Sequence, residues 1–257
     1  MVQSGQGAVR VCHVAVADLW AGAEVQLKVL LSKLVRKADI NLSVILFNEG
    51  RLEKEIGALG IPVKVFPENR WGSGKIFLEL VHEFKKSNIQ IIHTHKYKDT
   101  ILAAPAAKLS GIPHVVRTVH GLREPFEGLP AFNMSLYEAI ERTVHRYCVD
   151  SIIGVSSQIE NRYKAKGQVS SVTCIRNGID LEGKAVQSDR WRMRKDLGID
   201  SATCLIGTVG RLTPVKGIPY LLEAATILVR QGAKVKILVV GEGGIRQDLM
   251  AQTHSLG

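Results

Sequence analysis

Two cations lie close together in the segment GRLTPVKG, residues 210–217, which separates an apolar run from a helical pattern. Thr213 suits a helix N-cap and Pro214 a first helical residue, which predicts that Lys216 lies in the first turn of a helix. A cation there opposes the helix dipole, whereas a bound anion would reverse the sign of this effect. Arg211 offers a forked donor and Lys216 a point charge, so the pair could clamp a diphosphate. Two solvated surface cations are the alternative interpretation.

Glycines mark two further turns where a ligand could approach the backbone. Gly22, in AGAE, directly precedes a helical pattern, and the free N–H groups of a new helix suit an anion. A simple tight turn would explain Gly22 equally well. Gly241 and Gly243, in GEGG, follow a second apolar run and could let a nucleoside lie against the backbone. Neither turn is a GxGxxG fingerprint, and GK[ST] of a P-loop is absent.

Histidines occur at the ends of two predicted strands. His120, in TVHG, could bind a sugar hydroxyl or share a proton near neutral pH, although a lone histidine is more often structural. His93 and His95, in IIHTH, alternate with Thr94 and could share one face of a strand. Two histidines without a third ligand are a weak metal signal, so packing or cleft polarity is the expected role and no metal site is expected.

The elements that must position these residues alternate along the chain, as in a parallel sheet wrapped by helices. We expect strands at 9–17, 41–47, 62–66, 89–94, 113–119, 150–155 and 172–176. We expect helices at 23–37, 51–59, 74–87, 97–110, 132–147 and 157–166. Together they would fill one doubly wound α/β domain.

A polar segment then predicts a boundary between domains. We expect a first domain at 1–176, a linker with one short helix at 177–201, and a second βα series at 202–257. The second series predicts strands at 203–209 and 235–240, and helices at 215–230 and from about 244. Two strands fall short of a typical doubly wound sheet, so we expect the second domain to be incomplete and the chain to be a fragment.

Composition narrows the class of protein. With 257 residues, 46% hydrophobic and 23% charged, the chain is typical of a globular protein. A net charge of +10 favours anionic partners, although surface lysines that promote solubility explain it equally well. Four cysteines without CxxC spacing suggest reduced thiols and a cytoplasmic location, and no apolar run is long enough to span a membrane. Scattered aromatic residues provide no stacking platform for nucleic acid.

Taken together and in order, these motifs resemble the GT-B glycosyltransferases of the large retaining family 4. The matching segments are AGAE, HTH, TVHG, GVSS, RNGID, GRLTPVKG and VVGEGG. The resemblance implies two Rossmann-like doubly wound domains, the first mainly for the acceptor and the second mainly for a nucleotide-sugar donor. It implies that Arg211 and Lys216 neutralise the donor diphosphate as the glycosidic bond breaks.

The resemblance also implies roles for the remaining candidates. Gly22 would lie close to the donor phosphates, and His120 would contact the donor sugar and support the transition state without being established as a base. Gly241 and Gly243 would lie on the nucleoside side. No Asp-x-Asp metal motif is present, so no metal and no cofactor is expected. The paired glutamates of the family, eight positions apart, do not occur in the 257 residues, so we expect the fragment alone to lack full activity.

The sequence therefore predicts a retaining glycosyltransferase of polysaccharide, lipopolysaccharide or glycolipid biosynthesis. Its donor would be UDP- or GDP-linked and its acceptor a saccharide or a lipid-linked sugar. Its location would be the cytoplasm or the inner face of the membrane, with peripheral contact to anionic lipid left open. Two alternatives stay open: a non-hydrolysing nucleotide-sugar epimerase and a non-catalytic nucleotide-binding module.

Overall fold

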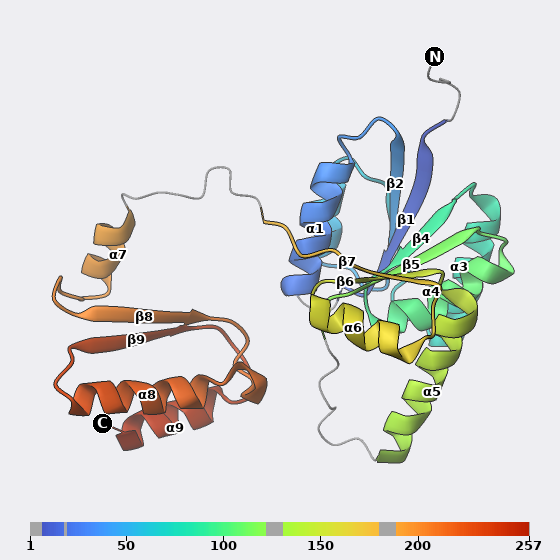
Figure 1. Cartoon of the computed structure of the whole chain (residues 1–257). Coiled ribbons are helices and arrows are strands. Elements are labelled where there is room, and N and C mark those ends of the chain that lie inside the picture. Colours follow the sequence, from blue (N-terminus) through green and yellow to red (C-terminus); the bar gives the residue numbers. More distant parts are fainter. Residues whose placement is uncertain (1–6, 18–19, 122–130, 180–188, 257) are drawn as a thin grey trace. The chain divides into compact units, whose positions relative to one another are not determined.

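The chain forms two compact units, Met1–Asp180 and Leu181–Gly257, each of which is described by itself (Figure 1). The computed structural model describes residues 7–17, 20–121, 131–179 and 189–256. Among these residues, no helix combines the length and the apolar character needed to cross a bilayer.

The first unit is built on a parallel sheet of seven strands with the order β3-β2-β1-β4-β5-β6-β7. The strands are β1 (Val9–Ala15), β2 (Ile40–Leu46), β3 (Val63–Val65), β4 (Ile91–Thr94), β5 (His114–Val119), β6 (Ser151–Gly154) and β7 (Ser171–Cys174). The chain runs outward from β1 to β3 and then returns to add β4 to β7 on the other side. The expected doubly wound parallel fold is therefore confirmed.

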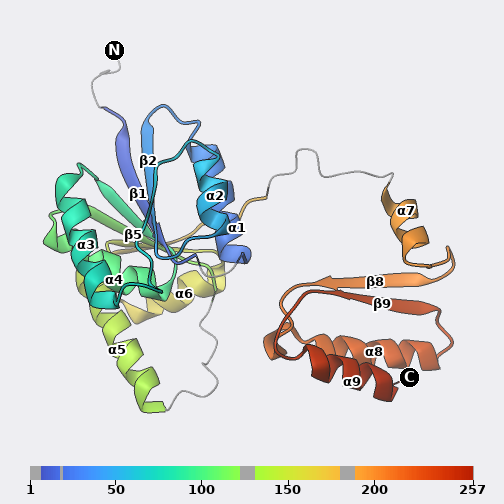
Figure 2. The ribbon, with the colours of Figure 1, turned by 180° about the vertical axis from the view of Figure 1, so that it is seen from behind.

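Helices cover both faces of this sheet (Figure 2). They are α1 (Gly22–Leu34), α2 (Arg51–Gly57), α3 (Ser73–Lys86), α4 (Tyr97–Leu109), α5 (Ala131–Cys148) and α6 (Ser157–Lys166). Side chains of α1 and α2 pack with β2 in one hydrophobic cluster. Side chains of α3 to α6 pack in a larger cluster against the opposite face. Alternation along each strand sends successive side chains to these two cores.

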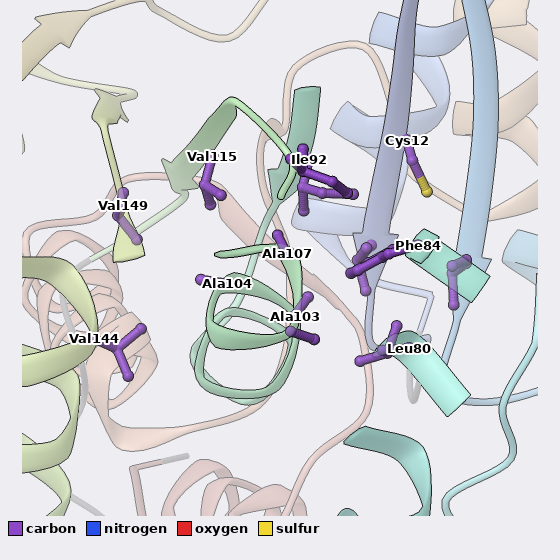
Figure 3. Packing of buried hydrophobic residues seen from close by; sticks show 14 of the residues in the cluster. Cys12, Leu80, Phe84, Ile92, Ala103, Ala104, Ala107, Val115, Val144 and Val149 are labelled. Atoms are coloured by element: carbon purple, nitrogen blue, oxygen red, sulfur yellow. The ribbon is translucent and has the colours of Figure 1, made fainter. Parts of the chain in front are cut away.

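The larger core depends on a run of small residues in α4 (Figure 3). Ala103, Ala104, Ala106 and Ala107 are completely buried. Because alanine adds only a methyl group, the helix backbone can approach the strands and the neighbouring helix closely. Larger side chains then fill the space around them, among them Leu80, Phe84, Ile92 and Val115.

A buried ion pair joins α5 to the middle of the sheet. Arg117 of β5 is 5% exposed, and its Nη1 lies 2.7 Å from Oε1 of Glu141 on α5. The same guanidinium nitrogen contacts Nε2 of His145, one helical turn further along α5. Burial, and then the neighbouring Arg117 charge, lowers the pKa of His145 to about 4. Glu141 is therefore the partner that neutralises the arginine.

The second unit contains a parallel pair of strands and three α-helices among its described residues. They are α7 (Asp189–Asp196), β8 (Cys204–Val209), α8 (Ile218–Arg230), β9 (Val235–Val240) and α9 (Arg246–Leu256), with a 3-10 turn at Pro214–Lys216. A small core of Leu212, Ile218, Leu222 and Leu249 holds the helices to the strands.

The helix expected at 215–230 begins later than the sequence predicts. The α-helix starts at Ile218, after the 3-10 turn and after Gly217, which is left-handed with φ 65°. Thr213 does not cap it with its side chain, and its buried Oγ1 lacks a hydrogen-bond partner in the part of the chain that the structure describes. The prediction that Lys216 lies in the first α-helical turn is therefore wrong. Pro214 and Gly217 favour a separate tight turn instead.

Candidate functional site

The topology of the first unit creates a crevice beside β1 and β4. These two strands are neighbours, but the chain leaves them toward opposite edges of the sheet, through α1 and α4 respectively. Loops that diverge from adjacent strands leave a gap at the carboxyl ends, where ligands of open α/β sheets bind. The residues around this gap form the candidate site.

Three imidazoles form a hydrogen-bonded chain at this edge. Nδ1 of His13 lies 3.0 Å from Nε2 of His95, and Nδ1 of His95 lies 3.3 Å from Nε2 of His120. His13 is fully buried and His95 is 5% exposed. Nε2 of His13 and Nδ1 of His120 are the two ends of the chain, and both are buried without a partner among the described residues.

A fourth histidine stacks against this chain without joining it. The ring of His93 lies 4.7 Å from that of His13 and 4.6 Å from that of His95, between centroids. Its Nε2 bonds to Oγ1 of Thr118 at 2.8 Å. His93 and His95 do share one face, as expected.

His13 is the residue of this cluster that the sequence analysis missed. It lies directly opposite His93 in the register of β1 and β4. Two residues that face each other across parallel strands point to the same side of the sheet. The usual doubly wound order places the first strand next to the fourth, so this order was the signal that could have paired the two histidines.

Burial keeps these imidazoles neutral. It lowers the pKa of His93 to about 4 and those of His13 and His95 well below the ordinary value, with neighbouring histidines as the next cause. Burial also lowers the pKa of His120, while the nearby Glu24 carboxylate acts in the opposite direction. At neutral pH, each ring therefore carries one N–H and one bare nitrogen.

The potential metal ligands in this cluster already have other partners. Nitrogens of His13, His93 and His95 lie within 4.8 Å of one another, which is a spacing that could hold an ion. However, the nitrogens of His13 and His95 bond to each other and that of His93 bonds to Thr118. A buried divalent ion held by neutral imidazoles alone would also lack a balancing charge. We therefore interpret the cluster as a hydrogen-bonded network.

The N-termini of α1 and α4 are joined by an ion pair beside this network. Glu24, only 3% exposed, pairs with Nζ of Lys96, and its Oε2 accepts a hydrogen bond of 3.2 Å from the N–H of Ala21. Asp99 likewise accepts bonds from the N–H groups of Lys96, at 2.8 Å, and of His95, at 3.2 Å. Burial raises the pKa of Asp99 to about 7. Carboxylates thus already occupy part of both helix N-termini.

Gly22 is the first residue of α1, and the fold does not require glycine there. Its φ is not positive, and a Cβ at this position would meet nothing within 4 Å. A tight turn therefore does not explain the residue. Open space and an exposed backbone at a helix N-terminus are consistent with close approach of a ligand, and the predicted phosphate contact stays a prediction.

Arg211 and Lys216 follow β8 in the second unit. Both are exposed, and neither forms an ion pair with any residue that the structure describes. The 3-10 turn separates them and ends at Lys216. Exposed cations at the carboxyl end of a strand are available to a diphosphate, which keeps the predicted clamp open for testing.

Gly241 and Gly243 hold the loop after β9 against the loop after β8. A Cβ on Gly241 would lie 1.9 Å from the carbonyl oxygen of Gly210, and one on Gly243 would lie 2.2 Å from that of Leu212. The N–H of Leu212 bonds to the carbonyl of Glu242 at 2.9 Å across the same contact. These glycines thus have a packing role, while their predicted nucleoside contact stays untested.

Replacing Gly243 with alanine is expected to destabilise the second unit by about 1–3 kcal/mol, because backbone must move to admit the methyl group. Urea unfolding followed by circular dichroism measures the change. Gly244→Ala is the matched control, since a Cβ there meets nothing within 4 Å. Equal unfolding midpoints for the two variants would contradict the packing role.

A polar pocket of about 530 Å³ opens at the carboxyl ends of β1 to β3. Glu68 lies at its wall, where it accepts a 2.7 Å bond from Nδ2 of Asn48 and pairs with Lys98. The lining residues are Ala17, Asn48, Glu49, Glu68, Asn69 and Lys98. Amides and carboxylates of this kind can bind hydroxyl groups.

Comparison with known families decides the classification of the chain. Residues 20–182 match the model of Glycosyltransferase Family 4. The chain belongs to this family. Residues 189–257 match a second model, Glycosyl transferases group 1, so both units of this family member fall within transferase models.

Curated relatives of this Family 4 chain are longer than it is. It is 26% identical to an Escherichia coli UDP-Gal:alpha-D-GlcNAc-diphosphoundecaprenol alpha-1,3-galactosyltransferase, over 96% of this chain and 66% of the relative. It is 30% identical to an alpha-maltose-1-phosphate synthase of Mycobacterium tuberculosis, over 62% of this chain and 44% of the relative. The chain thus spans less than two thirds of the length of these relatives.

Solved structures share the fold. The Anabaena protein HepE in complex with UDP and glucose matches with a TM-score of 0.76 at 20% identity, over 96% of this chain and 65% of that one. A UDP-N-acetylglucosamine 2-epimerase matches with a TM-score of 0.62 at 13% identity, over 97% and 66%. The GT-B architecture predicted from the sequence is therefore confirmed, and both transferases and epimerases use it.

Proposed function

We propose that the protein is a retaining glycosyltransferase that moves a sugar from a nucleotide-sugar donor to a saccharide or lipid-linked acceptor. The observation that carries the proposal is the match of both units, in sequence order, to glycosyltransferase family models. The polysaccharide-related or lipid-linked substrates named for relatives support the acceptor class.

Leaving-group stabilisation is the central chemical task in the proposed reaction. Charge grows on the nucleoside diphosphate as its bond to the sugar breaks, so fixed cations lower the barrier. Arg211 and Lys216 supply two positive charges on one loop. Because these side chains can balance the diphosphate, we propose that transfer needs neither a metal ion nor a cofactor.

His120 would orient the donor sugar in this mechanism. Its ring is neutral and hydrogen-bonded, which suits it to a contact with a sugar oxygen better than to a charge-bearing role. The polar pocket with Asn48, Glu68 and Lys98 at the same edge of the sheet is the proposed place for acceptor hydroxyl groups. A basic pocket between α5 and α6, lined by Arg142, Arg146, Arg162 and Lys166, would suit a peripheral contact with anionic lipid.

We propose a UDP-sugar as donor, because the named relative and the matching HepE structure both carry UDP in their descriptions. The assay uses the complete gene product that contains these residues, with labelled UDP- or GDP-sugars and GlcNAc-diphosphoundecaprenol as acceptor. We expect label on the acceptor from a UDP-sugar, with the anomeric configuration of the donor kept in the product, and the same rate after treatment with EDTA.

Other outcomes would identify the alternatives. An epimerised nucleotide sugar formed without acceptor would indicate an epimerase. UDP binding with no turnover of any donor would indicate a binding module. Either result would contradict the proposed transfer reaction.

A further inference from the structure

The chain of three histidines has a property that its members lack individually. Two hydrogen bonds join the neutral rings of His13, His95 and His120, and each bond needs one N–H and one bare nitrogen. If His13 donates from Nδ1, then His95 must donate from Nδ1 as well, and the proton of His120 must be on Nδ1. If His120 donates from Nε2, every ring carries its proton on Nε2. The three tautomers therefore change together.

The environment of the two ends distinguishes these states. One end, Nε2 of His13, belongs to a ring with no exposed surface, whereas His120 is partly exposed. A buried N–H without an acceptor is rarer in proteins than an acceptor without a donor. The state with a bare nitrogen at His13 and an N–H on Nδ1 of His120 is thus favoured. The negative charge of Glu24 near His120 acts in the same direction.

We propose that His13 and His95 are positioning residues that fix His120 as the Nδ1–H tautomer, so that His120 meets its ligand as a hydrogen-bond donor. The inference rests on the proposed function, in which His120 contacts the donor sugar. It refines that role, because a ring protonated at Nδ1 donates to a sugar oxygen and does not take up a proton there. His93, which stacks on the chain but bonds to Thr118, has no part in setting the tautomer.

Two-dimensional ¹H–¹⁵N NMR of histidine-labelled protein tests the tautomers directly, without substrate. We expect His13, His95 and His120 to carry their protons on Nδ1 at neutral pH. A proton on Nε2 of His120 would overturn the proposal, whatever the activity of the protein. This readout needs no variant, so a variant that fails to fold does not compromise it.

Substitutions test the coupling. In His13→Leu we expect His120 to lose its single tautomer and transfer to slow about ten-fold at unchanged acceptor KM, the factor expected for one hydrogen bond. His13→Asn is expected to restore the wild-type tautomer and rate to within about two-fold, because its amide nitrogen can replace Nδ1. His93→Gln is the matched control, since its amide can keep the bond to Thr118.

The outcomes separate this inference from the proposed function. An unchanged His120 tautomer in a folded His13→Leu variant, or equal losses in His13→Asn and His13→Leu, would refute the positioning role. The predicted tautomers together with no sugar transfer by the wild-type protein would instead refute the transferase activity and leave the coupling of the three rings established.

Discussion

Replacing Glu141 with alanine is expected to cost the first unit about 3–5 kcal/mol of unfolding free energy. The reason is that Arg117, 5% exposed, would keep its charge in the interior without a carboxylate to balance it. His145 cannot help, because the imidazole beside the guanidinium also acts as a base with a lowered pKa. Chemical denaturation followed by circular dichroism measures the loss.

Glu160→Ala provides the matched control for this effect. It removes a 2.8 Å ion pair with Lys164 on the surface of α6, where such pairs contribute about 1 kcal/mol or less. A double variant, Arg117→Met with Glu141→Leu, removes both charges and should recover most of the stability. If Glu141→Ala and Glu160→Ala cost the same, the buried pair does not anchor α5.

Removing both Arg211 and Lys216 is expected to abolish measurable UDP binding at micromolar concentrations. Each charge-assisted contact to a diphosphate contributes about 1.5–3 kcal/mol, so each alanine variant alone should weaken binding by roughly 10- to 150-fold. Isothermal titration calorimetry with UDP, and with uridine as a ligand that lacks the charge, measures the difference. Uridine affinity should stay the same in all variants.

Arg230→Ala is a suitable control for this clamp, because it removes a cation of the same unit from the far end of α8. UDP affinity that is unchanged in Arg211→Ala and Lys216→Ala would remove both residues from the donor site. A drop that Arg230→Ala matches would point to net charge and not to a specific contact.

The sequence predicted most elements because their signals are local. Alternating apolar runs and helical spacing located the strands and helices of the first unit to within a few residues, as the bounds of β2 and α6 illustrate. The start of α8 was misplaced because Pro214 and Gly217 stabilise a 3-10 turn that imitates a helix start. Short-range patterns describe both possibilities equally well, and only packing of Ile218 into the core decides between them.

The candidate site was harder to predict because it is assembled from distant residues. His93, His95 and His120 were visible as strand-end histidines, but the role of His13 depends on the register between β1 and β4. The pair Glu24–Lys96 joins helices 72 positions apart in sequence, and no local pattern signals it. Gly241 and Gly243 resembled ligand-contact glycines, whereas the structure gives them a steric reason in the loop they face.

The pair between Glu24 and Lys96 has a consequence for selectivity at the start of α1. A carboxylate of the protein itself already accepts a backbone N–H there and balances the nearest lysine. An incoming anion would therefore have to compete with this resident charge, or meet a surface that is electrically balanced. An uncharged, hydroxyl-bearing group faces no such competition, so this crevice is better matched to the sugar portion of a ligand than to free phosphate.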